Sequence, residues 1–181
     1  MTTIKIENIV AYAKISELLD IELLSEKIPK SSYNPEELNG LSIKFDDLKI
    51  AVIVLSNGKI VCTGAEKIED AESIIKKITK QVKSVGFEVK KDYEVKIENV
   101  IASADLKKEL HLASIANALV LQNVDYKPEE FPGLIYRMEE PCAVVLLFSQ
   151  GKIICTGAKS VEDAKKSIKE MVDKLASLGV L

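Results

Sequence analysis

Apolar residues follow the same order twice along the chain, and in each round they predict strands before a closing helix. In the first round an alternating run at Ile4–Ala13 predicts a strand, and a stretch at about Asp20–Ile28 predicts a short helix. Apolar-rich runs around Leu41–Phe45, at Ile50–Leu55 and at Lys59–Thr63 predict three more strands. This order favours an α+β fold whose sheet is built mainly from hairpins.

The turn between the last two strands is the strongest local signal. Asn57-Gly58 stands between two apolar runs. The dipeptide favours a two-residue type I′ turn, because both central residues of that turn need a positive φ, which Asn and Gly adopt easily. We therefore expect a tight antiparallel hairpin at this position.

The closing helix is clearest in the second round. Ser160-Val161-Glu162-Asp163 resembles a capping box, and Gly179 stands where helices commonly end in the left-handed conformation. An apolar stripe recurs between them at helical spacing: Ala164, Ile168, Met171, Val172 and Leu175. A similar stripe ends at Gly86 in the first round.

The two rounds are copies of one another. Three segments return in order: Tyr33–Leu41 as Tyr126–Leu134, Ser56–Ala65 as Ser149–Ala158, and Lys5–Asn8 as Lys96–Asn99. The shift is 93 residues for the first two segments and 91 for the third. Repetition at a nearly constant shift marks a tandem duplication, in which the second copy gained two residues relative to the first. The second copy repeats the opening strand at Val95–Ala104 and the short helix at about Leu112–Leu121. With the junction near Lys90-Lys91-Asp92, the chain divides into a first repeat, 1–91, and a second repeat, 92–181.

The central strands are apolar on both faces. Both alternating sets of side chains in Ala51–Leu55 are apolar, and Val144–Phe148 repeats this. Two helices in each repeat can cover only one face of a hairpin sheet, so the other would remain a broad apolar surface, which in a water-soluble protein indicates a binding site for something large. The pattern alone leaves open the alternative that helices cover both faces.

Composition narrows the classes of function. The 181 residues carry a net charge of −3, so binding to nucleic acid requires segregated cations or a large apolar contribution. Three cysteines without a CxxC pair favour a reduced, cytoplasmic protein, and we expect neither a membrane span nor a signal peptide. No nucleophile–base set or metal-ligand cluster can be assembled. We therefore expect no enzyme activity, metal or cofactor, with Cys62 and Cys155 packed under helices and His111 at a helix cap or the surface.

Longer motifs identify the chain as similar to a known family. Tyr126–Met138 resembles the second-repeat signature of TATA-binding proteins, and Phe148–Lys152, Thr156–Lys159 and the two Asn-containing opening strands agree with it. The resemblance covers essentially the whole chain, and the short N-terminus suggests an archaeal member. It implies a tandem-repeat saddle, with a curved ten-stranded antiparallel sheet and four helices on its convex face. It also implies a general transcription factor that binds and bends TATA-like DNA through the minor groove.

The resemblance assigns DNA contacts residue by residue. The polar contacts to minor-groove acceptors are Asn8, Asn99, Thr63 and Thr156, a set that suits A·T pairs because guanine adds an amino group there. The apolar contacts to the groove floor are Val10, Ile53, Val61, Ile101, Leu146 and Ile154. The wedge positions are Phe131 and Phe148, with Leu38 and Leu55 at the corresponding sites of the first repeat. The cations facing phosphates are Lys44, Lys59, Arg137, Lys152 and Lys159.

The first repeat departs from the family pattern. Leu38 and Leu55 replace phenylalanines, Glu66 stands where Lys159 predicts a cation, and Tyr12 replaces a small residue. These departures predict weaker kinking at the first-repeat end. They also support an alternative, a divergent paralogue that acts as a protein-interaction or regulatory module with weakened DNA binding.

The resemblance also implies partners. Glu129 matches an acidic position that helps to dock transcription factor B, so we expect recruitment of that factor and of the RNA polymerase pre-initiation complex to double-stranded promoter DNA. The apolar underside could also pair two copies of the free protein in a homodimer. The expected location is the nucleoid, in the cytoplasm of an archaeal cell.

Overall fold

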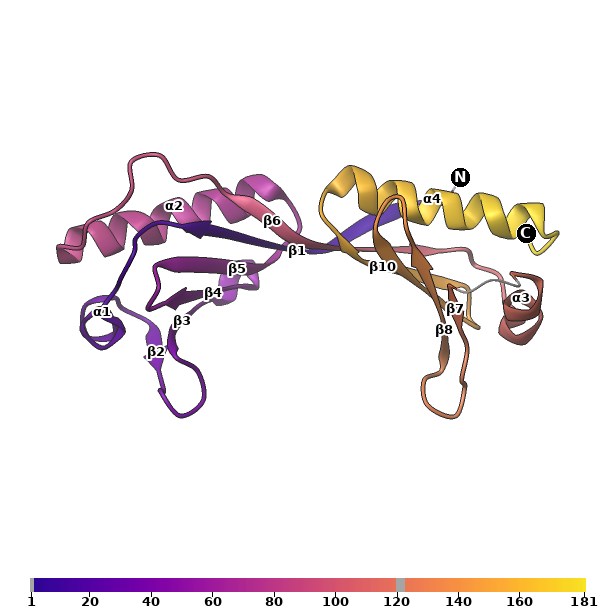
Figure 1. The fold of residues 1–181 in the computed structure, drawn as a ribbon, viewed down its shortest axis with the longest axis horizontal. Coiled ribbons are helices and arrows are strands. Elements are labelled where there is room, and N and C mark those ends of the chain that lie inside the picture. Colours follow the sequence, from indigo (N-terminus) through magenta and orange to yellow (C-terminus); the bar gives the residue numbers. More distant parts are fainter. Residues whose placement is uncertain (1, 120–122) are drawn as a thin grey trace. The chain divides into compact units, whose positions relative to one another are not determined.

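The computed structural model describes residues 2–119 and 123–181, which contain ten strands and four α-helices (Figure 1). The strands are β1 Ile4–Lys14, β2 Ser31–Tyr33, β3 Gly40–Phe45, β4 Ile50–Leu55, β5 Lys59–Ala65, β6 Lys96–Asp105, β7 Val124–Asp125, β8 Gly133–Met138, β9 Ala143–Phe148 and β10 Lys152–Ala158. The helices are α1 Ile21–Lys27, α2 Ile68–Val85, α3 Leu112–Ala118 and α4 Val161–Ser177, with a short 3-10 helix at Asp46–Leu48.

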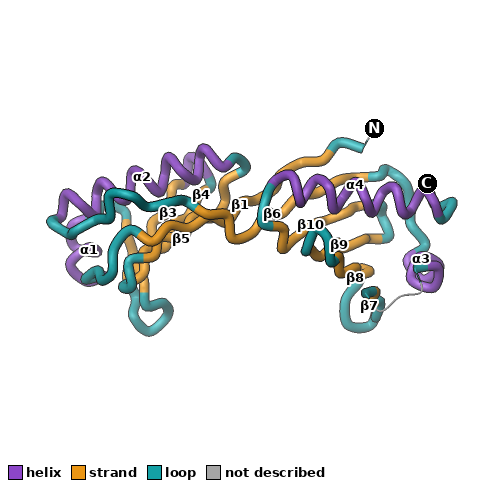
Figure 2. Tube along the Cα trace, turned by 45° about the horizontal axis from the view of Figure 1, so that its top comes forward, coloured by secondary structure: helices purple, strands orange, loops and turns teal. Residues whose placement is uncertain are grey.

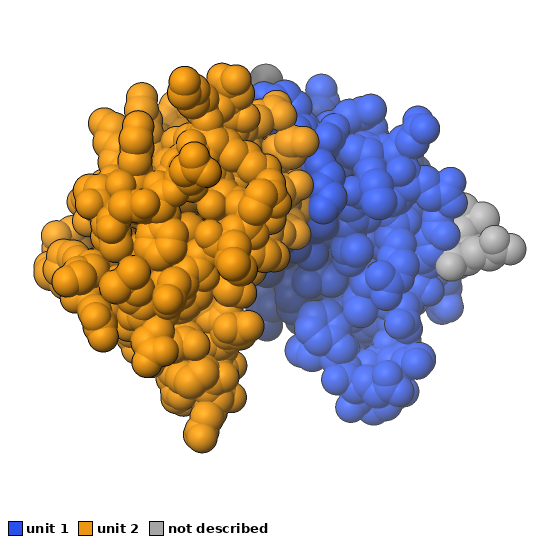
Figure 3. Space-filling view, turned by 60° about the vertical axis from the view of Figure 1, so that its left-hand side comes forward, with its two compact units in different colours: residues 1–7, 99–181 blue, residues 8–98 orange. Residues whose placement is uncertain are grey.

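The chain forms two compact units (Figure 3). One comprises residues 8–98, and the other comprises residues 1–7 and 99–181. The strand order is β2-β3-β4-β5-β1 in the first-repeat unit and β6-β10-β9-β8-β7 in the second-repeat unit. Residues 1–7 belong with the second repeat because Ile4 lies beside Ile168 and Val172 of α4, and because Glu7 accepts a hydrogen bond from Ser103.

In the first-repeat unit, helices cover one face of the strands (Figure 2). The long helix α2 packs on β5, and α1 packs on β2 and β3. Val52 and Val54 of β4 and Ile60 of β5 point into this layer and are fully buried, as is Ile75 of α2. Their strand neighbours on the other face are only partly buried. One face therefore holds the core, and the other is open.

The second-repeat unit repeats this arrangement. Helix α4 packs on β9 and β10, and α3 packs on β8. Val145, Leu147 and Ile153 are fully buried against Ile168 of α4. The predicted opening strands, central strands and closing helices are confirmed within a residue or two. The expected extension of the short helix beyond Leu119 falls on 120–122, outside the described residues.

The hairpin turn differs from the prediction. Gly58 has φ 78°, but Asn57 does not have a positive φ, so the expected type I′ turn is wrong. Gly58 N–H donates to the Leu55 carbonyl, which closes a three-residue loop with a single left-handed residue at its end. This is a type I turn followed by a glycine bulge. The second repeat forms the same loop, in which Gly151 has φ 89° and bonds to the Phe148 carbonyl.

The caps of α4 agree with the sequence pattern. The Ser160 hydroxyl accepts a hydrogen bond of 3.0 Å from Asp163 N–H, which satisfies one of the free donors of the first turn. Gly179 has φ 70° just beyond the helix, as a C′ glycine should. The boundaries of α4 are therefore fixed by local residues as well as by the apolar stripe.

Candidate nucleic-acid interface

The open face of the first-repeat unit is a continuous surface of short rows that cross the strands. In one row Tyr12, Val61, Ile53 and Ser42 stand opposite one another on β1, β5, β4 and β3. In the next row Thr63, Ala51 and Lys44 pair across β5, β4 and β3. Along its strand, each of these side chains alternates with residues buried under the helices. The row members are partly buried, apart from Lys44 at the outer end, which is exposed. The rows form an apolar strip with a cation at its margin.

The second-repeat unit presents the equivalent rows. Ser103, Ile154, Leu146 and Ile135 face one another on β6, β10, β9 and β8. Thr156, Val144 and Arg137 form the next row, with the guanidinium at the exposed outer end. The helices thus leave one sheet face open in both units, and the alternative that both faces are covered is wrong.

Asn8 is held in one orientation by a β-bulge. The register between β1 and β5 shifts between Ile9 and Ala11, and Gly64 on β5 has φ 98° there. Gly64 N–H donates to Asn8 Oδ1 over 2.7 Å, and Asn8 Nδ2 donates to Thr63 Oγ1 over 3.2 Å. Because a backbone N–H can only donate, it fixes which end of the carboxamide is oxygen. The second hydrogen of Nδ2 remains as a donor.

Asn99 repeats this arrangement in the other unit. Gly157 N–H donates to Asn99 Oδ1 over 2.6 Å, and Asn99 Nδ2 donates to Thr156 Oγ1 over 3.3 Å. Gly157 has φ 87° at the corresponding bulge of β10. Sequence reasoning found Asn8, Asn99 and the two threonines but missed both glycines. The signal was the Thr-Gly-Ala that ends each hairpin, since an isolated glycine in a strand often marks a bulge.

These bonds bear on the stability of the fold as well as on ligand contact. A freely exposed Asn99 could be truncated with almost no effect on stability. The observed carboxamide instead satisfies a strand N–H, so its removal should cost about 1 kcal/mol of folding free energy as well. The residue therefore has a structural role in the strand as well as a donor on the open face.

Of the four wedge positions, Leu38 and Phe131 stand on loops closed by equivalent backbone hydrogen bonds, and Leu55 and Phe148 end β4 and β9. Leu38 N–H bonds to the Asn34 carbonyl over 2.9 Å, and Phe131 N–H bonds to the Lys127 carbonyl over 2.9 Å. The Phe131 and Phe148 rings lie edge to face with centroids 5.9 Å apart. Leu38 has 38% of its surface exposed. The second repeat thus has a formed aromatic pair, and the first has two aliphatic side chains.

The predicted cations differ in their surroundings. Lys44, Arg137, Lys152 and Lys159 are exposed, as is Glu66 at the position equivalent to Lys159. Lys59 is only partly exposed, because its ammonium lies 4.3 Å from the centre of the Tyr12 ring and 3.5 Å from the Glu98 carboxylate. The remaining predicted apolar contacts, Val10 and Ile101, alternate with buried residues on the open face.

Other chemistry-bearing residues lie away from this face. Cys62 and Cys155 are fully buried under the helices, as expected, and burial raises the pKa of the Cys62 thiol to about 11. His111 stands exposed at the cap position of α3, within 3.1 Å of the Ser114 hydroxyl. Glu129 is exposed on the loop before Phe131. Among the described residues there is no cluster of three metal-ligating side chains, and no helix is long and apolar enough to cross a membrane.

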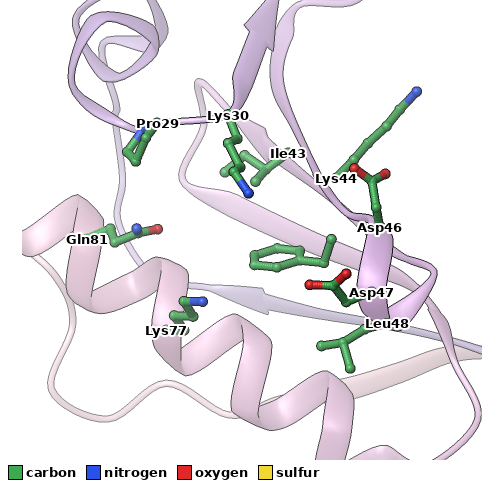
Figure 4. Close-up of a pocket in the computed structure, with 10 residues that line it drawn as sticks. Pro29, Lys30, Ile43, Lys44, Asp46, Asp47, Leu48, Lys77 and Gln81 are labelled. Carbon is green, nitrogen blue, oxygen red and sulfur yellow. The ribbon is translucent and has the colours of Figure 1, made fainter.

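Each unit also has a hollow on its helix side, at equivalent positions of the two repeats. In the first repeat a cavity of about 400 Å³ is lined by Ile43, Lys77 and Gln81, among others (Figure 4). In the second repeat the cavity is about 230 Å³, because Tyr136 replaces Ile43 and its hydroxyl accepts a bond of 2.6 Å from Lys174. Each hollow reaches the margin of the open sheet face, because Lys44 lines the first and Arg137 lines the second.

Comparisons with known proteins agree with this geometry. Residues 3–85 and 94–178 match the family model for transcription factor TFIID, or TATA-binding protein. The TATA-box-binding protein of Archaeoglobus fulgidus is 44% identical over 178 residues, covering 98% of this chain and 97% of the relative. That of Thermococcus sibiricus is 43% identical over the same length, covering 98% and 95%.

The solved structure of Methanococcus jannaschii TBP is similar with a TM-score of 0.84 and 41% identity, over 96% of this chain and 98% of that one. The fold class expected from the sequence, a tandem repeat of antiparallel strands with four helices, is therefore confirmed. With both repeats matched by one family model and with full-length archaeal relatives, this chain belongs to the TATA-binding protein family, which are transcription factors and not enzymes.

Proposed function

We propose that this protein binds TATA-like promoter DNA in the minor groove through its open sheet face, bends it, and recruits transcription factor B and RNA polymerase. The observation that carries the proposal is the pair of oriented carboxamides, Asn8 and Asn99. Each is held by a glycine N–H on one side and a threonine hydroxyl on the other. The same polar device therefore appears on the open face of both units.

The orientation of these amides suits A·T base pairs. With Oδ1 occupied by the glycine N–H, each Asn offers its remaining Nδ2 hydrogen. The Thr156 hydroxyl can add its own hydrogen, whereas the Thr63 hydroxyl also lies 3.4 Å from Asn8 Oδ1, to which it can donate. The minor-groove edge of an A·T pair shows only the acceptors adenine N3 and thymine O2, whereas guanine adds a donor. A donor-only site between apolar rows should therefore favour A·T and disfavour G·C.

The test is a gel-shift titration of a TATA duplex against the same duplex with central G·C pairs. We expect tighter binding to the TATA duplex, and tight binding again when inosine replaces guanine, because inosine lacks the protruding amino group. Equal binding to all three duplexes would contradict minor-groove readout.

A matched variant isolates the donor. Asn99→Asp keeps an oxygen that can accept from Gly157 N–H but removes the Nδ2 donor and adds charge. We expect it to unfold at nearly the same temperature as wild type and to lose TATA binding. A variant that folds and binds normally would rule out the role of the amide.

Recruitment of transcription factor B is proposed through the second-repeat loop, where Glu129 is exposed before the Phe131 wedge. Its position beside the wedge, on a loop outside the apolar rows, would leave it accessible while DNA occupies the open face. A protein with these functions would reside on the nucleoid.

A second function remains a candidate because Lys59 is engaged by Glu98 and Tyr12, and because Leu38 replaces an aromatic wedge. With these two features the first repeat has one fewer cation available for phosphates and no aromatic wedge. They favour a regulatory paralogue whose open face binds protein. The same titration separates the two, since a regulatory module would show weak binding with little preference for TATA. Sedimentation of the free protein would show whether the open face pairs two copies.

A further inference from the structure

Tyr12 breaks the correspondence between the two open faces. It stands on β1 between the fully buried Ala11 and Ala13, so its side chain lies on the open face, directly across from Val61 of β5. The equivalent position on β6 is Ser103, across from Ile154. The first repeat therefore has a large planar ring at a place where the second has a two-atom side chain.

The Tyr12 ring is held in place by Lys59, whose ammonium lies over the ring face. The Lys59 ammonium lies 4.3 Å from the ring centre, and the Glu98 carboxylate lies 3.5 Å from the same ammonium. A cation over an aromatic face is an attractive contact, and the carboxylate keeps the cation there. A tyrosine has only two side-chain torsions, so this contact leaves it little freedom. In the other unit the Ser103 side chain is buried, and its hydroxyl donates to the Glu7 carboxylate over 2.5 Å.

We infer that Tyr12 is a specificity-determining residue that makes the first-repeat half of the interface the stricter one against a minor-groove amino group. The inference rests on the proposed function, because it concerns DNA seated on the open face. A rigid ring on the groove floor takes up the space into which the guanine N2 amino group projects. Ser103 leaves that space open at the equivalent position of the second-repeat half.

Tyr12 and the wedge positions predict opposite asymmetries between the two repeats. Leu38 and Leu55 predict that the first repeat deforms DNA less, whereas Tyr12 predicts that it reads the groove floor more strictly. Bending and reading would then be divided unequally between the two halves. Such a division is visible only because the two halves arose from one repeat.

The experiment uses a non-palindromic TATA duplex in which 2,6-diaminopurine replaces adenine at one position at a time. This base adds the amino group to an A·T pair and leaves its other minor-groove groups unchanged. For wild type we expect a loss of about tenfold in affinity at one or two positions of one half-site, the size of a single base discrimination. Tyr12→Ser should reduce that loss to less than about threefold there and leave the other positions unchanged.

Two further readouts keep the outcomes apart. Tyr12→Phe retains the ring and should keep the wild-type profile, and both variants should match wild type in thermal unfolding because Tyr12 is only half-buried. If Tyr12→Ser gives the wild-type profile, the inference is overturned while the proposed function stands. If wild type does not bind the unsubstituted duplex, the proposed function itself fails.

Discussion

The two wedge loops share two backbone hydrogen bonds but differ in their wedge side chains. In each loop two backbone N–H groups donate hydrogen bonds to one carbonyl, that of Asn34 in the first repeat and that of Lys127 in the second. In the second repeat both aromatic rings lie on Gly133, where an added Cβ would stand 2.7 Å from a Phe131 carbon and 3.2 Å from a Phe148 carbon. At Gly40 of the first repeat the nearest such atom belongs to Leu55, at 2.9 Å.

The position of a wedge side chain and its ability to stack on a base therefore depend on different parts of the structure. The loop backbone and the glycine beneath it bring a side chain to the same place in both repeats. The size and flatness of that side chain then decide whether it can stack on an exposed base. We therefore expect an asymmetric complex with DNA, in which the sharper kink lies beside Phe131 and Phe148.

The largest effect should come from truncating the wedge. Phe148→Ala removes both a stacking surface and the partner of Phe131, and should cost about 1–3 kcal/mol of DNA-binding free energy. Leu55→Ala removes a side chain that cannot stack, and should cost less than about 1 kcal/mol. Fluorescence anisotropy with a labelled TATA duplex measures both. Equal losses would mean that the two ends act alike.

The two carboxamides should behave alike, in contrast to the two pairs of wedge residues. Asn8→Ala and Asn99→Ala remove equivalent donors and should each weaken TATA binding by about 1–3 kcal/mol. Each should also lower the free energy of unfolding by about 1 kcal/mol, because Gly64 or Gly157 loses its acceptor. Denaturant titration checks the second effect. A stability loss without an affinity loss would confine these residues to a structural role.

The two repeats should also differ in how much a charge reversal on the loop weakens binding of transcription factor B. Glu129→Arg reverses a charge on the second-repeat loop and should weaken the ternary complex with transcription factor B about tenfold, with DNA binding nearly intact. Glu36→Arg makes the same change at the equivalent position of the first repeat and serves as the control. If both variants assemble the ternary complex like wild type, the docking role of Glu129 is wrong.

Restoring the aromatic pair should give a smaller gain. Leu38→Phe combined with Leu55→Phe should tighten binding by about 0.5–1 kcal/mol, the worth of an aromatic pair beyond its area, or increase the bend. Fluorescence energy transfer across an end-labelled duplex reports the bend. A variant that combines Leu38→Ile with Leu55→Ile, measured on the same duplex, controls for a change in side-chain shape. If the isoleucine and phenylalanine variants bend the duplex equally, stacking is not what increases the bend.

The smallest functional effect is expected at the cysteines. Burial raises the pKa of both Cys62 and Cys155, and a bond with the Ser167 hydroxyl partly opposes this shift at Cys155. A raised pKa keeps the thiol protonated at pH 8, so both should resist alkylation in the native state while the exposed Cys142 reacts. Mass spectrometry after iodoacetamide treatment checks the order, with urea-unfolded protein as the control. Rapid native labelling of Cys62 would contradict its burial.

Most of the fold follows from the sequence because apolar runs and turn residues agree in both repeats. The edge strands β2 and β7 gave no periodic signal, since they are only three and two residues long. The turn type was missed because the choice between a two- and a three-residue loop depends on strand register, which Asn57-Gly58 does not encode.

The candidate site was predicted as a set of residues but not as an arrangement. Family resemblance located Asn8 and Thr63, yet the bond between Asn8 and Gly64 depends on a register shift between strands that are distant in sequence. The contact of Lys59 with Tyr12 was missed for a similar reason, because the two residues meet only when β1 lies beside β5. Sequence patterns give the alternation of a strand but not the offset of its partner.

The β-bulges have a consequence for how a duplicated protein of this kind can change over time. At Asn8 and Asn99, drift is opposed twice, because replacing the carboxamide by an apolar side chain leaves a strand N–H without its acceptor and also removes a donor from the open face. At Leu38, 38% of whose surface is exposed, drift has little effect on folding. Under the proposed function, mutations at the wedge positions would change how strongly a gene duplicate bends DNA and leave the fold intact, whereas mutations at the carboxamides would change base-pair preference and stability together.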